Sequence, residues 1–283
     1  MKMSSLQLEA FLQTAKLRSF SRAATALSVT PSALSQRISN LEAELETTLF
    51  IRDPSGPLLT STGEQLLRYC QVMDSLEQEV LSDLKSSIGK LAGSIRVAAF
   101  SSVLRSVIIP SLAGFLRANP MVHCEFQSDE MTQLPSVLKT AEADFVILDY
   151  PLKKSGILEH VLGKEEYVVI ESAKFDSPED LYLDHGPDDN ATELFFREQP
   201  RAPVKIRRSF MGDVYGIIDG VERGLGRAVM SRHLAEGNPR LKMLKGYRSY
   251  HRTVTLHYFE QPYYSRLHQE VVRQLEKNCA EWL

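Results

Sequence analysis

The 283-residue sequence has only three cysteines, one tryptophan and no long apolar run. The cysteines, Cys70, Cys124 and Cys279, stand far apart and form no Cys-x-x-Cys pair, which argues against a disulfide framework and favours reduced thiols. The N-terminus lacks the apolar stretch of a secretory signal, and no window approaches the ~18 apolar residues of a membrane span. We therefore expect a cytoplasmic protein that makes no membrane contact.

Motifs for catalysis and metal binding are also missing. The sequence has no Gly-x-Ser-x-Gly, no His-Glu-x-x-His and no phosphate-binding loop, and its seven histidines show no metal-ligand spacing. We therefore expect neither an enzyme nor a bound metal or cofactor. The net charge of −3 gives no sign of nucleic-acid binding, so any such signal must be local.

The first sixty residues predict a small helical unit with a hairpin. Apolar spacing indicates helices near 5–17, 21–27 and 31–45, and Thr30 followed by Pro31 is a favoured helix start. We expect Ser21 to cap the second helix. Short strands at 49–52 and 58–60 flank a turn rich in proline and glycine and predict a wing. Residues 1–60 therefore read as a winged helix-turn-helix domain.

The third helix of this unit has two contrasting faces. Leu34, Ile38 and Leu41 recur at helical spacing and predict a buried stripe. The opposite face is small and polar, and consists of Ser32, Ser35, Gln36 and Ser39. Such a face fits a DNA major groove, where glutamine pairs with adenine and serine bonds several bases. The alternative is a solvated surface without a partner.

Basic residues in this domain are few, with six against five acidic ones up to Thr60. Arg37 lies beside the polar face and can reach a phosphate or a partner within the domain. Arg52, next to the turn, can enter a minor groove or meet a phosphate. The candidate DNA contacts are Arg22, Thr30, Pro31, Ser32, Ser35, Gln36, Arg37, Ser39 and Arg52.

The rest of the chain consists of two further regions with different predicted secondary structure. A long helix is predicted within 61–90, and its seam of Leu66, Tyr69, Met73, Leu76 and Val80 is typical of a dimer contact, or else packs on its own chain. From 91 to 283, strands alternate with helices, which predicts parallel sheets. The region between the strand at 167–170 and Pro203 reads as irregular.

The N-terminal part of the sequence resembles the LysR-type transcriptional regulators. The resemblance rests on Ser19–Ala24, Leu27–Ile38, Leu41-Glu42, Leu49–Arg52 and Leu59–Gly63, in the order and spacing of that family. The family commonly has Gln-Pro where this sequence has Pro31-Ser32, which bears on base preference. A weaker similarity at Ile217–Gly226 leads to a Gly-x-Gly turn.

The resemblance implies a multidomain α+α/β fold. It consists of the winged helix-turn-helix, a long linker helix, and a two-lobed α/β effector domain similar to periplasmic binding proteins. Lobe 1 is expected at about 91–162 plus 262–283, and lobe 2 at about 163–261. Small ligands bind between such lobes, beside strand ends and helix starts.

Candidate effector contacts follow from this placement. Ser101 and Ser102 follow a predicted strand, and their hydroxyls and nearby N–H groups can hold a carboxylate, unless they serve only as a helix cap. Asp129 and Glu130 follow the next strand and can meet an ammonium or guanidinium group, or simply open a helix. Met211, Gly212 and Asp213 can close the site from lobe 2.

A narrower similarity suggests the kind of effector. Ser32–Ile38, Asp184-His185 with Asp188-Asp189, and His251-Arg252 resemble the lysine- and arginine-responsive regulators of amino-acid export. The implied partners are double-stranded DNA, a small effector such as lysine or arginine, a second copy in a homodimer or homotetramer, and RNA polymerase. The competing classes are a small-molecule-binding protein whose N-terminal helices only dimerise, and an enzyme built on the lobes.

Overall fold

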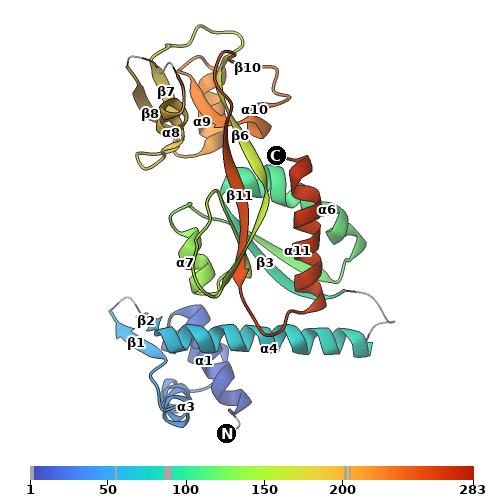
Figure 1. Cartoon of the computed structure of the whole chain (residues 1–283). Helices are drawn as coiled ribbons and strands as arrows, with labels where there is room; N and C mark the ends of the chain where they lie inside the picture. Colours follow the sequence, from blue (N-terminus) through green and yellow to red (C-terminus); the bar gives the residue numbers. More distant parts are fainter. Residues whose placement is uncertain (1–2, 55, 86–90, 201–202, 204) are drawn as a thin grey trace.

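The computed structural model describes residues 3–54, 56–85, 91–200, 203 and 205–283. Figure 1 shows three parts in sequence: a small helical domain with a hairpin, one long helix, and a two-lobed α/β domain. Among the described residues, no helix is both long and apolar enough to cross a membrane. The predicted multidomain architecture is confirmed.

The N-terminal domain packs three helices around one core. They are α1 (Ser5–Leu17), α2 (Phe20–Ala26) and α3 (Pro31–Glu44). Thr30 caps α3 as predicted, with its hydroxyl accepting the N–H of Ala33 at 3.1 Å. The predicted Ser21 cap of α2 is wrong. Ser19 is the cap, because its hydroxyl accepts the N–H of Arg22 at 3.3 Å and the helix starts one residue later.

The hairpin behind α3 forms the predicted wing. Strands β1 (Phe50–Asp53) and β2 (Gly56–Leu59) pair antiparallel. Gly56 has a φ of 123°, and a Cβ there would lie 2.6 Å from the carbonyl oxygen of Arg18, so the turn requires glycine. The Glu42 carboxylate accepts the N–H of Leu49 at 2.7 Å, which fixes the start of the wing against α3.

Helix α4 (Ser61–Lys85) is the linker between the two domains. Leu66, Leu67 and Cys70 are buried in the core of the N-terminal domain. Tyr69, Met73 and Val80 share the helical stripe of Leu66 but are 44%, 47% and 57% exposed. Leu66 therefore packs on its own chain, while the outer part of the predicted seam is left uncovered.

The C-terminal domain contains a seven-stranded sheet that is mixed rather than parallel. Strands β3 (Gly93–Ala99), β4 (Val122–Ser128) and β5 (Phe145–Leu148) are parallel. Strands β6 (Ile157–Ser172), β9 (Ala228–Ser231), β10 (Leu241–Met243) and β11 (Tyr250–Phe259) join antiparallel. A separate parallel pair, β7 (Leu181–Asp184) and β8 (Arg207–Phe210), belongs to lobe 2.

Strands β6 and β11 run through both lobes as one antiparallel ribbon (Figure 1). The register of the ribbon shifts between Val254 and Thr255. Thr255, Leu256 and His257 pair with β5, so this part of β11 lies in the sheet of lobe 1. The predicted boundary at residue 261 therefore differs from the structure, because the ribbon changes lobe within a strand rather than in a loop.

Helices cover both faces of the sheets. In lobe 1, four helical segments share one core, which includes Val97 and Ile147: α5 (Ser101–Val103), a π-helical segment (Leu104–Ile108), α6 (Ile109–Ala118) and α11 (Arg266–Asn278). Helix α7 (Leu134–Lys139) packs on Ala98 and Val146, on the other side of the sheet. In lobe 2, the helices are α8 (Ala191–Arg197), α9 (Val214–Glu222) and α10 (Arg232–Ala235). A 3-10 turn, Cys279–Glu281, follows α11. The supposedly irregular region before Pro203 thus contains β7 and α8.

The N-terminal domain rests on the end of α7 in lobe 1. Arg18 pairs with Glu142 at 2.5 Å, and Lys139 pairs with Glu64 at 3.1 Å. Ala141, between these pairs, is buried within the core cluster of the N-terminal domain. The two domains are thus joined by packed contacts as well as by α4.

Candidate DNA-binding and effector sites

The predicted recognition face of α3 is open to solvent. Pro31, Ser32, Gln36 and Ser39 are exposed, and Ser35 is half-buried. Leu34, Ile38 and Leu41 are buried on the opposite side, against α1 and α2. The helix therefore presents small polar side chains outward from a rigid apolar base, as a groove-binding helix requires.

Hydrogen bonds order part of this face. The Gln36 amide donates to Asn40 Oδ1 at 2.8 Å, one turn further along α3. The Thr30 and Ser32 hydroxyls lie 3.0 Å apart at the helix start. Asn40 is exposed and extends the polar face by one residue that the sequence analysis missed. The i, i+4 spacing from Gln36 was the available signal.

The basic candidates differ in what they contact. Arg22 is exposed and its guanidinium donates to the carbonyl oxygen of Leu17, at the end of α1. Arg37 makes no hydrogen bond or ion pair with any described residue. Its guanidinium is therefore available to a phosphate, the first of the two predicted alternatives. The side chain of Arg52 lies outside the described part of the structure.

Ser101 and Ser102 begin the helical segment that follows β3. This segment faces lobe 2. The cap position belongs to Phe100, so neither serine serves as the helix cap. Neither hydroxyl makes a hydrogen bond with a described residue, and Ser102 is 5% exposed. Two hydroxyls and the first N–H groups of the helix are thus left to bind an anionic group.

Glu130 lies directly opposite lobe 2. Its carboxylate is 3.2 Å from Nε2 of His185, which follows β7. The His185 ring also lies edge-on to Phe100, with centroids 5.5 Å apart. The other nitrogen of His185, Nδ1, is buried without a hydrogen-bond partner among the described residues. Asp129 accepts instead from the Gln127 amide at 2.7 Å, in its own lobe.

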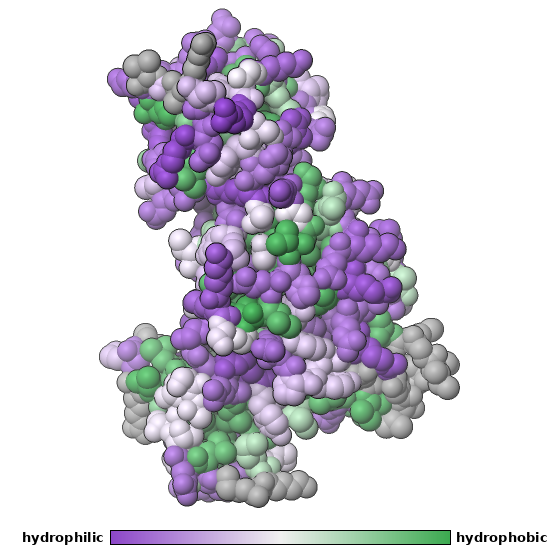
Figure 2. All heavy atoms as spheres, viewed as in Figure 1, coloured by the Kyte–Doolittle hydropathy of each residue, from purple (hydrophilic) through white to green (hydrophobic). Residues whose placement is uncertain are grey.

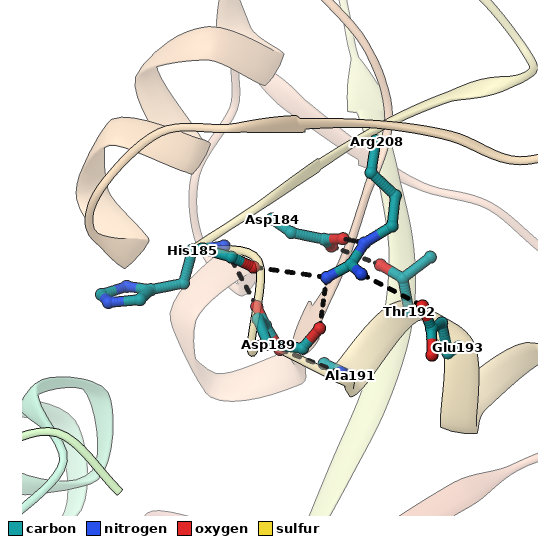
Figure 3. Close-up of polar contacts among 8 residues, drawn as sticks. Asp184, His185, Asp189, Ala191, Thr192, Glu193 and Arg208 are labelled. Carbon is teal, nitrogen blue, oxygen red and sulfur yellow. Dashed lines mark hydrogen bonds and ion pairs between the residues drawn. The ribbon is translucent and has the colours of Figure 1, made fainter. Parts of the chain in front are cut away.

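A buried ion pair holds the loop that carries His185 (Figure 3). Asp184 is 1% exposed. Its carboxylate accepts one hydrogen bond from the Arg208 guanidinium and another from the Thr192 hydroxyl at 2.5 Å. Arg208 also donates to the carbonyl oxygen of Asp189, and the Asp189 carboxylate accepts the N–H of His185 at 3.1 Å. In Figure 3 the His185 ring points away from this network. The network therefore positions His185 and leaves its ring for the lobe interface.

The lobe 2 residues at 211–213 have structural partners. Asp213 caps α9, with one carboxylate oxygen accepting the N–H groups of Tyr215 and Gly216, both at 2.8 Å. Gly212 has a φ of 84° and donates its N–H to the carbonyl oxygen of His185 at 3.0 Å. Met211 donates its N–H to the carbonyl oxygen of Asp184 at 3.0 Å. These residues therefore brace the His185 loop.

Three further contacts join the lobes. Arg252 of β11 pairs with Asp149 at 2.6 Å and donates to Asn190 at 2.9 Å. The Ser106 hydroxyl lies 2.8 Å from Nδ1 of His233, whose Nε2 is 2.7 Å from Glu165. The guanidinium of Arg105 lies 4.0 Å from the ring centre of Tyr215.

Asp149 is one of the interface residues that the sequence analysis missed, although its position could have indicated it. It follows β5 directly, as Asp129 follows β4, and Ser101 stands two residues after the end of β3. The rule that ligands meet the carboxyl ends of parallel strands applied equally to this position. Burial opposes the charge on Arg252, but Tyr167 and Asp149 raise its pKa, so the pair is a firm contact between the lobes.

Two family models match nearly the whole chain. Residues 6–64 match the bacterial regulatory helix-turn-helix protein of the lysR family, and residues 89–280 match the LysR substrate binding domain. The HTH-type transcriptional activator IlvY of Salmonella typhimurium is 26% identical over 82% of this chain and 83% of its own. The uncharacterized HTH-type transcriptional regulator YvbU of Bacillus subtilis is 27% identical over 84% of both chains.

Solved structures share the fold. ArgP from Mycobacterium tuberculosis superposes with a TM-score of 0.77, and full-length LysG from Corynebacterium glutamicum with bound effector Arg superposes with 0.73. Both are 20% identical, and each superposition covers 97% of both chains. The named relatives are transcriptional regulators, not enzymes. With a helix-turn-helix and an effector-binding domain in the matching order, this chain belongs to the LysR family of DNA-binding transcriptional regulators.

Proposed function

We propose that this regulator reads a two-fold operator with α3 and responds to a basic amino acid bound between its lobes. The single observation that carries the proposal is the facing of Glu130 and His185 across the lobes, beside two serine hydroxyls without partners. An amino acid needs an anion site and, for lysine or arginine, a cation site. This interface offers both kinds of group.

The DNA contacts are assigned to residues 1–60. Ser32, Ser35, Gln36 and Ser39 would read base edges in the major groove, while Arg22, Arg37 and Arg52 would meet phosphates or the minor groove. Thr30 and Pro31 set the start of α3. Replacing both Ser35 and Gln36 with alanine is expected to reduce discrimination between operator and random DNA, and to leave non-specific binding nearly unchanged.

The proposed effector contacts divide by charge. Ser101 and Ser102 would hold the carboxylate, and Glu130, with Asp129 beside it, would meet the guanidinium or ammonium group. Met211, Gly212 and Asp213 would support the site from lobe 2. The binding domain is assigned to 91–283, with residues 61–90 as linker.

Calorimetric titration of the full chain tests this assignment. L-Arginine and L-lysine are compared with L-citrulline, which has nearly the shape of arginine but no charge. Glu130→Gln is expected to weaken arginine binding at least tenfold, which is about 1.4 kcal/mol, while Glu125→Gln on the exposed face of β4 serves as the matched control. Equal affinity for arginine and citrulline would contradict a basic amino acid as effector.

Oligomer formation through α4 completes the proposal. The exposed side chains of Tyr69, Met73 and Val80 suit a seam with a second copy, in a dimer or tetramer. Effector binding would shift the closure of the lobes, change the spacing of the paired recognition helices, and so alter DNA bending and contact with RNA polymerase. Sequencing of DNA recovered by the purified protein, with and without amino acids, tests this proposal. The absence of an enriched two-fold motif under every condition would refute it.

A further inference from the structure

A cavity of about 80 Å³ lies between the linker helix and lobe 1, apart from the interface of the lobes. One wall is α4, through Arg68 and Gln71. The other walls are the start of β3, the end of β11 at Phe259, and the first turn of α11. Measured in the same way, as the volume open to the centre of a water-sized sphere, one water molecule needs about 10–15 Å³. The cavity therefore has room for a small organic molecule.

Among the described residues of α4, two charged side chains line the cavity, Arg68 and Asp74. The Arg68 guanidinium lies 4.4 Å from the ring centre of Phe259. It makes no hydrogen bond or ion pair with a described residue, although its N–H groups form a fork suited to a carboxylate. Burial lowers the pKa of Arg68, against a smaller opposing effect of the Glu64 carboxylate.

The acidic groups near Arg68 are already occupied or lie at the solvent side. Glu64, one turn earlier on α4, pairs with Lys139 at 3.1 Å. Asp144 accepts from the Arg96 guanidinium at 2.6 Å and from the Arg96 backbone N–H at 2.8 Å. Asp74 is exposed. Arg68 is therefore the lining cation that has no hydrogen bond or ion pair to a described residue, whereas Arg266, which also lines the cavity, has interactions of its own and Asp144 is paired with Arg96.

The remaining lining is suited to a short apolar body. Val72, Leu91, Ile95 and Leu267 supply aliphatic surface, and Phe259 supplies an aromatic face. The Gln71 amide nitrogen donates to the carbonyl oxygen of Ala141 at 2.6 Å, which leaves its own oxygen for the cavity.

We propose that this cavity is a second ligand site, which binds a small monocarboxylate with a branched aliphatic body. Arg68 forms the ion pair with the carboxylate, and the aliphatic side chains enclose the body. A ligand seated here touches α4 and lobe 1 together. It therefore stabilises the docking of the linker on the effector domain, independently of any effector between the lobes.

The test uses the full-length protein and isovalerate as the probe, with binding followed by ligand-observed NMR. Wild-type protein is expected to bind with a Kd on the order of 1 mM, the range of a ligand with few heavy atoms. Isovaleramide, which has the same shape without the charge, is expected to bind at least tenfold more weakly. Arg68→Gln is expected to weaken isovalerate binding at least tenfold, whereas Arg117→Gln on the exposed end of α6 leaves it unchanged.

Thermal unfolding establishes whether each variant is folded, and Arg68→Lys provides a second variant that keeps the charge but loses the fork. This variant is expected to bind with intermediate affinity. Three results overturn the proposal: equal binding by wild type and Arg68→Gln, equal binding of acid and amide, or no saturation in a titration carried about tenfold past 1 mM. Titration of Arg68→Gln with arginine reports on the interface of the lobes separately.

Discussion

His268 makes the stability of lobe 1 depend on pH. Its ring lies among aromatic side chains, with centroids 4.4 Å from Phe145, 4.7 Å from Tyr264 and 4.9 Å from Tyr258. This burial lowers the pKa of His268 from 6.5 to about 4, against a small opposing effect of Asp144. Between these values the unfolded chain binds a proton that the folded chain does not, so stability falls as the pH falls through 6.5 toward 4.

The size of the effect follows from the two pKa values. At pH 5 the unfolded histidine is almost fully protonated and the folded one is mostly neutral, which costs about 2 kcal/mol of stability relative to pH 7. Because the side chain is only half-buried and borders the cavity, this value is an upper bound. His268→Phe removes the proton site and keeps an aromatic ring.

Urea unfolding at pH 7 and pH 5 measures the effect, with protein concentration held constant. The fluorescence of Trp282, the single tryptophan, reports on the end of lobe 1 that follows α11. The loss of unfolding free energy between the two pH values is expected to be up to about 2 kcal/mol smaller in His268→Phe than in wild type. His123→Phe, at an exposed position on β4, is the control. An equal loss in wild type and His268→Phe would refute the reasoning.

Three other substitutions test separate parts of the molecule. Arg208→Met leaves Asp184 buried without its partner and is expected to cost about 3–5 kcal/mol in urea unfolding, whereas Arg207→Met, in an exposed pair with Asp180, should cost less than about 1 kcal/mol. Val80→Glu places a charge on the uncovered side of α4 and should dissociate the oligomer in light-scattering chromatography, while Glu77→Gln should not. Arg37→Gln should weaken operator and random DNA alike and reduce the salt slope by about 1, and a selective loss of operator binding would assign Arg37 to base recognition.

Local signals made the N-terminal domain predictable from the sequence. Thr30 and Pro31 fix the start of α3 through a cap and a preset backbone angle, and both act within one turn of the chain. The error at α2 was small, because Ser19 and Ser21 are both good caps and only the packing of Phe20 on the core distinguishes them. A polar helix face opposite an apolar one is likewise visible in sequence.

The ribbon and the lobe interface were much less predictable. Only the end of β6, at 167–170, was predicted as a strand, because Lys164, Glu165 and Glu166 stand in a row before it and no apolar alternation marks the first part. It is a strand because β11 pairs along its length, which is a tertiary effect. The facing of Glu130 and His185 depends on how two lobes close, and residues 55 positions apart carry no local signal of that kind.

The shared ribbon also bears on how the effector domain unfolds. Each of its two strands contributes backbone hydrogen bonds to the sheets of both lobes, so neither lobe can melt without exposing an unpaired strand edge in the other. The two lobes are therefore one cooperative folding unit, despite having separate apolar cores. The N-terminal domain shares no strand with them, so it is the part of the chain that can open by itself.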